Sequence, residues 1–207
     1  MSVYNTDFPL VKRAIDSVLN QDFKEFEFII IDDGSDEIFK IELENYVNLH
    51  ANNIIYRYHF NCGQSKSINE GVLISTGKYI AIIDADDEYK PNHLSACLEE
   101  MKQADLIAST TQTIVDKEDD YYVPDKKDPT KLIHVDDCIL FATLFGKKEV
   151  FEFVKFENKY AADALFFENA SKKFKTLKVN LRTYIYYRNI PNSISANFKR
   201  QYSKKVV

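Results

Sequence analysis

Carboxylates cluster directly after an apolar run in the stretch IAIIDADDEY, residues 80–89. Asp84, Asp86 and Asp87 lie within four positions of one another. Two carboxylates about 4 Å apart repel by about 1 kcal/mol in water and by about 4 kcal/mol in a partly screened protein site. Such a cluster is therefore tolerated at low cost only where water or a cation absorbs the repulsion.

A second acidic pair, Asp32 and Asp33, follows the apolar run from Phe28 to Ile31 and precedes Gly34. A short isoleucine-rich run closed by a turn is typical of a strand buried on both faces. Acids at a strand end can simply solvate a turn, and for either group alone that interpretation stays open. Two acidic strand ends on one edge of a sheet favour a ligand site.

The elements that must position these acids alternate between strand and helix along the first hundred residues. This order predicts a parallel sheet with helices on its faces, and such sheets bind ligands beyond the carboxyl ends of their strands. Both acidic groups should therefore meet at one edge. Strands are predicted at residues 28–31, 53–60, 78–84 and 104–110, and helices at residues 10–19, 36–49, 64–76 and 91–103.

The rest of the chain is less regular. Residues 116–131 are highly charged and contain two prolines, which predicts a mobile loop or a domain seam. Residues 138–154 are mixed in character, residues 162–174 look helical, and residues 177–189 alternate like a strand.

Composition excludes several classes of function. The 207 residues fit one domain or a domain with an appendage, and 45% of them are hydrophobic, ample for a core. The net charge of −5 argues against a nucleic-acid partner. No apolar run approaches the roughly 20 residues that cross a bilayer, and the N-terminus lacks the pattern of a signal peptide. We therefore expect a cytoplasmic protein.

Cysteine and histidine give no local signal. The scattered Cys62, Cys97 and Cys138 contain no C-x-x-C pair, so neither a disulfide framework nor a zinc site is predicted. The four histidines show no metal-ligand spacing, so we interpret them as structural or surface residues. Nothing near Cys62 in the sequence forms a nucleophilic dyad, and a covalent mechanism is not indicated.

Several segments, in order, resemble the inverting family-2 glycosyltransferases: SVYN, SVLNQDFKEFEFIIIDDGSD and NCGQSKSINEGVLISTGKYIAIIDADDEYKP. The resemblance is strong over about residues 2–100 and continues in YAADALFFENA and YYRNIPNSIS. It implies an α/β fold of the GT-A type, with a mostly parallel central sheet, helices on both faces and a smaller mixed acceptor-side region. It also implies one domain over residues 1–207, with a nucleotide-sugar-binding half at 1–104 and an acceptor-binding half at 105–207.

The resemblance assigns roles to the acids and to one aromatic residue. Tyr4 would stack on the nucleobase, unless it is a core residue. Asp33 would accept a hydrogen bond from the base, and Asp84 would face the ribose or nearby water. Asp86 would bind the metal. Asp32 and Asp87 would position their turns.

A nucleotide sugar carries a negative diphosphate, so acids beside it require a cation. Carboxylate and phosphate oxygens favour Mg²⁺ or Mn²⁺, and either ion is the implied cofactor. We expect the ion to bind weakly to the empty protein and more strongly with nucleotide.

Inverting transfer requires a base that deprotonates the acceptor hydroxyl. The segment that matches the family's acidic pair reads Ala161-Ala162-Asp163. Ala162 replaces the usual Glu, and Asp163 would be the base. Alternatively, Asp163 is a helix N-cap, a position where Asp is favoured.

The sequence departs from the family at three places. Most of the usual first strand is missing before Tyr4, so either the true start lies upstream or the sheet tolerates a short strand. Many relatives carry Arg where Ile68 stands, and commonly His where Ile190 stands. Arg188 and Ser193 are then the candidates for phosphate contact.

The resemblance thus predicts a metal-dependent inverting glycosyltransferase that moves a sugar from a UDP-sugar to a glycan, polysaccharide or lipid-linked acceptor. The alternative is a nucleotide-binding module of little activity, because of the short first strand and the missing His. A phospho-acceptor signalling domain also gathers acids at strand ends, but it fits the DDGS and DADD spacing poorly. The tail YSKKVV permits peripheral association with the inner face of a membrane. Donor sugar, linkage and oligomeric state are not set by the sequence.

Overall fold

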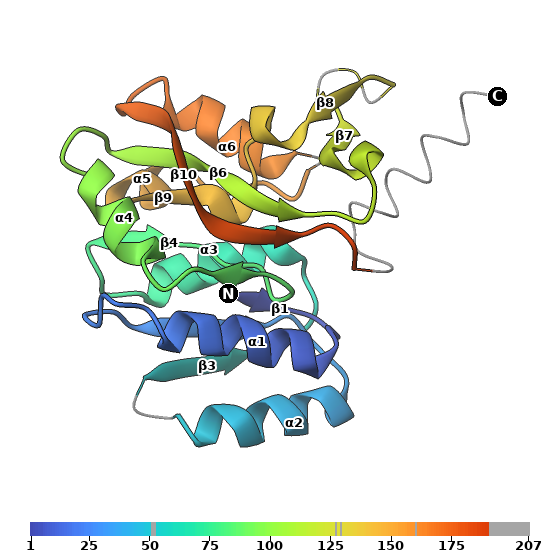
Figure 1. Cartoon of the computed structure of the whole chain (residues 1–207). Coiled ribbons are helices and arrows are strands. Elements are labelled where there is room, and N and C mark those ends of the chain that lie inside the picture. Colours follow the sequence, from blue (N-terminus) through green and yellow to red (C-terminus); the bar gives the residue numbers. More distant parts are fainter. Residues whose placement is uncertain (51–52, 127, 129, 160, 191–207) are drawn as a thin grey trace.

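The computed structural model describes residues 1–50, 53–126, 128, 130–159 and 161–190 (Figure 1). Its first half alternates strand and helix, as predicted. The elements are β1 (Ser2–Val3), α1 (Phe8–Leu19), β2 (Phe28–Asp32), α2 (Glu37–Asn48), β3 (Ile54–Tyr58), α3 (Gln64–Ile74), β4 (Tyr79–Ala81), β5 (Glu88–Tyr89), α4 (His93–Glu100) and β6 (Leu106–Ile114).

The first sheet is parallel and has the order β1-β2-β3. Every residue of the central strand β2 is buried. The short strand β1 nevertheless has a neighbour on each side, because Ser2 also forms a parallel bridge with Asp84, beyond the end of β4. The two acidic strand ends therefore flank β1, and the prediction that they meet at one edge is confirmed.

Helices cover both faces of β2, as the fold prediction requires. Ile30 packs in a buried cluster with Ile15 of α1 and Leu43 of α2. On the opposite face, Ile31 lies in van der Waals range of Gly71 on α3. The alternating sides of one strand thus account for the helices on either side of this sheet.

The second sheet is mixed, with the order β4-β9-β6-β10-β5. Strands β6 and β10 are parallel, whereas β9 runs antiparallel to both β4 and β6. Because β4 and β5 come from the first hundred residues, the two halves of the chain share this sheet, which fills the upper part of Figure 1. The second half of the chain contributes β7 (Tyr122–Pro124), β8 (Leu132–His134), β9 (Leu144–Lys147), α5 (Lys148–Phe153), α6 (Ala162–Ala170) and β10 (Thr176–Tyr187). Strands β7 and β8 form a hairpin that is separate from both larger sheets.

The prediction of a loop at residues 116–131 is wrong for residues 118–124, which form a 3-10 turn and strand β7. Strand β7 pairs antiparallel with β8, with Tyr122 opposite His134. The His134 ring also stacks on Tyr121 at a centroid distance of 5.5 Å. Pairing and stacking partners that lie ten or more residues away outweigh the local charge and proline content.

Among the described residues, no helix combines the length and apolar character that spanning a bilayer requires.

Candidate active site

A cavity of about 1260 Å³ lies at the acidic edge of the first sheet and extends to the start of α6. It is lined by five residues to which the sequence analysis assigned ligand contact or catalysis, while Arg188 is not among the lining residues. The five residues are Tyr4, Asp33, Asp84, Asp86 and Asp163.

Tyr4 follows β1 directly, and 52% of its surface is exposed. The alternative interpretation of Tyr4 as a core residue is therefore wrong. An aromatic ring that is open to a cavity offers one face for stacking a planar ligand. The position of the ring depends on β1, whose pairing on both sides fixes the backbone just before it.

The first acidic pair is fully engaged in hydrogen bonds. Asp32 is buried and accepts from the Ser35 backbone N–H at 2.9 Å and from the Tyr56 hydroxyl at 2.9 Å, so it positions its turn as expected. Asp33 is 3% exposed. It accepts from the backbone N–H of Cys62 at 2.7 Å and of Gly63 at 2.9 Å.

Two glycines allow the Asp33 carboxylate to hold residues 61–63. Gly34 has φ +82°, and a Cβ there would lie 2.5 Å from the backbone nitrogen of Asn61. Gly63 has φ +95° and precedes the first residue of α3. Both need a left-handed conformation, which glycine adopts without steric cost. The turn after β2 and the start of α3 are thus locked together through Asp33.

The second acidic group is held differently. Asp84 accepts from the Gln64 side-chain amide at 2.8 Å, and burial together with repulsion by Asp86 and Asp163 raises its pKa to about 7. Burial also raises the pKa of Asp86. Both side chains are partly exposed and line the cavity. These carboxylates are consequently costly to ionise in the empty cavity.

Asp87 instead connects the turn after β4 to β10 through hydrogen bonds. It is 1% exposed, accepts the backbone N–H of Tyr187 at 2.7 Å and is hydrogen-bonded to the Tyr184 hydroxyl. The expectation that Asp87 orients the turn agrees with these contacts.

Arg13 of α1 also contacts the turn that contains Asp86 and Asp87. Its guanidinium donates to the backbone carbonyl of Asp86 at 2.5 Å and pairs with Glu88 at 3.1 Å. It also lies 3.8 Å from the ring centre of Tyr187, whose hydroxyl donates to Glu88. No local pattern indicates this contact, because Arg13 lies 73 positions from Asp86 along the chain.

Asp163 is the second residue of α6, and its carboxylate accepts the Ala164 backbone N–H at 2.7 Å. The residue at the N-cap is Ala161, with φ 54°, so the alternative interpretation of Asp163 as the N-cap is wrong. Burial raises the pKa of Asp163 to about 6. A carboxylate in a first helical turn is favoured by the helix dipole, which fits its stability there.

The departures from the family pattern have structural counterparts. Ile68 is buried in an apolar cluster with Val72 and Phe166. Arg188 is 7% exposed, and its guanidinium donates to the Asp120 carbonyl at 2.6 Å. Its NH1 group donates to the Tyr186 hydroxyl at 3.2 Å. A contact between Arg188 and a phosphate stays a prediction. Ser193 lies outside the described residues.

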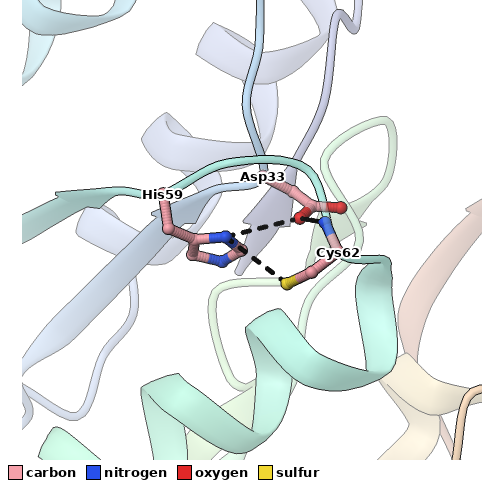
Figure 2. A group of neighbouring side chains, drawn as sticks. All are labelled: Asp33, His59 and Cys62. Carbon is pink, nitrogen blue, oxygen red and sulfur yellow. Dashed lines mark hydrogen bonds and ion pairs between the residues drawn. The ribbon is translucent and has the colours of Figure 1, made fainter.

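His59 and Cys62 lie together, which sequence spacing did not indicate. The Cys62 sulfur is 3.5 Å from His59 Nδ1 (Figure 2). Burial and the neighbouring Asp33 raise the pKa of the Cys62 thiol. Because a nucleophilic cysteine needs a lowered pKa, this pair is not an activated nucleophile.

Comparison with known proteins gives one consistent picture. Residues 1–175 match the family model for glycosyl transferase family 2. WcaA of Escherichia coli, named as a glycosyl transferase of colanic acid biosynthesis, is 40% identical over 96 residues, which are 45% of this chain and 34% of WcaA. The matched regions span 30% to 56% of the length of five curated relatives.

Solved structures share the fold at low sequence identity. S. aureus TarS 1-349 in complex with UDP-GlcNAc superposes with a TM-score of 0.71 at 18% identity, over 99% of this chain and 64% of that one. The mannosyltransferase PcManGT from Pyrobaculum calidifontis, in complex with GDP-Man and Mn²⁺, superposes with a TM-score of 0.73 at 13% identity, over 96% and 58%. These likenesses confirm the GT-A type of α/β fold.

Proposed function

This chain belongs to glycosyl transferase family 2, and from that premise we propose that it transfers a sugar from a UDP-sugar, with inversion, to a hydroxyl of a glycan, polysaccharide or lipid-linked acceptor. The observation that carries the proposal is the cavity that gathers Tyr4, Asp33, Asp84, Asp86 and Asp163. The UDP-GlcNAc complex of TarS supports the choice of UDP, and the name of WcaA supports a polysaccharide acceptor.

Tyr4 and Asp33 would bind the nucleobase. The half-exposed Tyr4 ring offers a stacking face. Asp33 accepts from three donors, Asn61, Cys62 and Gly63, and the Gly63 N–H contacts both carboxylate oxygens, at 3.3 Å and 2.9 Å. A ring N–H of the base would replace the longer of these two contacts, and Gly63 would keep the shorter one.

Asp86 would hold a divalent cation, with Asp84 beside it. The donor set fits this role, because two carboxylates with raised pKa values share one cavity and hard cations prefer such oxygens. Mn²⁺ or Mg²⁺, when bound, would offset the charge of the diphosphate and of the departing nucleotide. The Mn²⁺ in the PcManGT complex supports this assignment.

Asp163 would accept the proton of the acceptor hydroxyl. It lines the cavity, and its carboxylate is held by the backbone N–H of Ala164, which would keep it in place beside the acceptor hydroxyl. A pKa of about 6 suits a general base better than that of an ordinary aspartate, because the proton transfer is better matched near neutral pH.

The proposal is tested by the variant Asp163→Asn. With Mn²⁺ and a panel of UDP-sugars and acceptor glycans, we expect turnover to fall by about 10²–10⁴-fold while UDP binding stays within about twofold of the parent. The matched control is Asp137→Asn, an exposed acid of the same cavity, which should retain turnover.

Two outcomes would contradict the proposal. Turnover that survives in Asp163→Asn would remove this residue from the chemistry. A parent protein that binds UDP but neither transfers nor hydrolyses any UDP-sugar would favour the alternative, a nucleotide-binding module without activity.

A further inference from the structure

A carboxylate, an imidazole and a thiol converge behind the cavity wall, of which Asp33 forms part (Figure 2). Asp33 stands just after β2, His59 just after β3, and Cys62 in the turn before α3. The His59 Nδ1 lies 3.5 Å from the Cys62 sulfur and 3.6 Å from Asp33 Oδ1. The three ligand atoms all lie within 4.8 Å of one another. The three side chains point toward one another in Figure 2.

The separations of His59 Nδ1 from the other two ligand atoms, 3.5 and 3.6 Å, match those of a tetrahedral zinc site. Bond lengths of about 2.3 Å to sulfur and about 2.0–2.1 Å to nitrogen or oxygen place neighbouring ligand atoms about 3.3–3.6 Å apart. We propose that Asp33, His59 and Cys62 form a binding site for Zn²⁺ or a chemically similar ion, with the remaining coordination position open to water. This site is separate from the Asp84 and Asp86 carboxylates.

The neighbours of the three residues support ligation. His59 Nε2 is 3.2 Å from the Ser67 hydroxyl, which donates to the Gly63 carbonyl and can accept the Nε2 proton. A metal-bound histidine commonly donates its other ring N–H in this way, which fixes the tautomer. Nδ1 lies 2.8 Å from the Phe60 carbonyl, so its proton would move to Nε2 on binding.

The other two ligands are also available. Asp33 accepts four hydrogen bonds from three donors, and the 3.3 Å contact of the Gly63 N–H with Oδ1 would give way to the ion, because this N–H also donates to Oδ2 at 2.9 Å. The Cys62 thiol would release one proton to solvent as sulfur binds the ion. Sulfur and imidazole ligands select zinc-like ions, whereas carboxylates alone favour Mg²⁺ or Mn²⁺. The chemistry therefore separates the two sites by ligand type.

Occupation of this site has a consequence for the nucleotide. The ion would take the Asp33 lone pair that the proposed function gives to the nucleobase, so zinc would weaken UDP binding. This consequence rests on the proposed function, whereas metal binding itself does not.

The test is a Co²⁺ titration of the full chain, followed by absorption spectroscopy. Cobalt replaces zinc in such sites and reports a bound thiolate through a charge-transfer band. We expect one equivalent of Co²⁺ to produce that band, Zn²⁺ to abolish it and excess Mg²⁺ to leave it unchanged. In Cys62→Ser the band should disappear, and in His59→Gln the Co²⁺ affinity should fall by at least about tenfold.

The matched control is Cys138→Ser, which removes another partly buried thiol, one that lines the cavity, and should keep the band. Thermal melts of all variants verify that they are folded. A parent protein without the band, or a band that survives Cys62→Ser or is lost in Cys138→Ser, would overturn the proposal.

Discussion

The acidic groups after β2 and after β4 look alike in the sequence, but the structure holds them in different ways. Asp33 is buried and accepts hydrogen bonds from the backbone N–H groups of Cys62 and Gly63, at 2.7 and 2.9 Å. Asp84 and Asp86 instead face the cavity with raised pKa values. Burial disfavours the ionised form of Asp84 and of Asp86, and repulsion by neighbouring acids adds to this effect at Asp84. Asp33 therefore stabilises the fold, whereas Asp84 and Asp86 repel each other when ionised, and a bound cation would offset that repulsion.

The largest effect that distinguishes the two groups is expected in catalysis. Asp86→Asn removes a cation ligand, and because such an ion contributes several kcal/mol to transition-state stabilisation, we expect turnover to fall by about 10³-fold. The thermal melting temperature of the empty protein should not fall, because a repulsive charge has been removed. Steady-state kinetics and a melt of the same preparation measure both. A melting temperature of Asp86→Asn far below that of the parent would show that Asp86, like Asp33, stabilises the fold, and would contradict the account.

The second effect concerns stability at the other acidic group. Asp33→Ala leaves the N–H groups of Cys62 and Gly63 without their acceptor, and each unsatisfied buried group costs about 1–3 kcal/mol. We expect the free energy of unfolding to drop by about 3 kcal/mol, as measured by urea denaturation. Asp33→Asn keeps one acceptor oxygen and should lose about half as much. Unfolding unchanged in Asp33→Ala would mean that this carboxylate does not organise the loop.

The smallest effect is a pH dependence. The Asp84 pKa rises from 3.8 to about 7 on folding, so the folded state binds more protons than the unfolded state between these values. The stability of the empty protein should therefore fall as pH rises from about 4 to about 7. The shift corresponds to about 4 kcal/mol at most, and because the side chain is partly open to the cavity we expect about 2 kcal/mol.

Asp84→Asn should remove most of this pH dependence and stabilise the protein at pH 7. Urea denaturation of parent and variant at both ends of the range measures the difference. If the free energy of unfolding depended on pH in the same way in both proteins, Asp84 would not be the source of the pH dependence.

Much of this arrangement could be predicted, because it follows from local pattern. The apolar run ending in Asp32 and Asp33 and the one ending in Asp84 give the strand ends, and parallel order brings those ends together. These strand ends require only the periodicity of neighbouring residues. The role of Tyr4 is instead implied by the family resemblance, and its exposure agrees with that role.

Contacts between distant segments could not be predicted. Arg13 meets the Asp86 carbonyl across 73 positions, and Tyr187 meets Asp87 across 100. Likewise, His59 comes beside Asp33 only through the pairing of β2 with β3. Such partners depend on sheet order and register, which hydrophobic patterns leave open, and the difference in burial between the two acidic groups depends on them too.

The central claim is that Asp86 joins a divalent cation to the diphosphate of the donor. Calorimetric titration of UDP with and without Mn²⁺ tests it most directly. We predict that Mn²⁺ tightens UDP binding by at least about tenfold in the parent protein and has no effect in Asp86→Asn. UDP binding that is equally tight with and without Mn²⁺ in the parent, or an undiminished Mn²⁺ effect in Asp86→Asn, would contradict it.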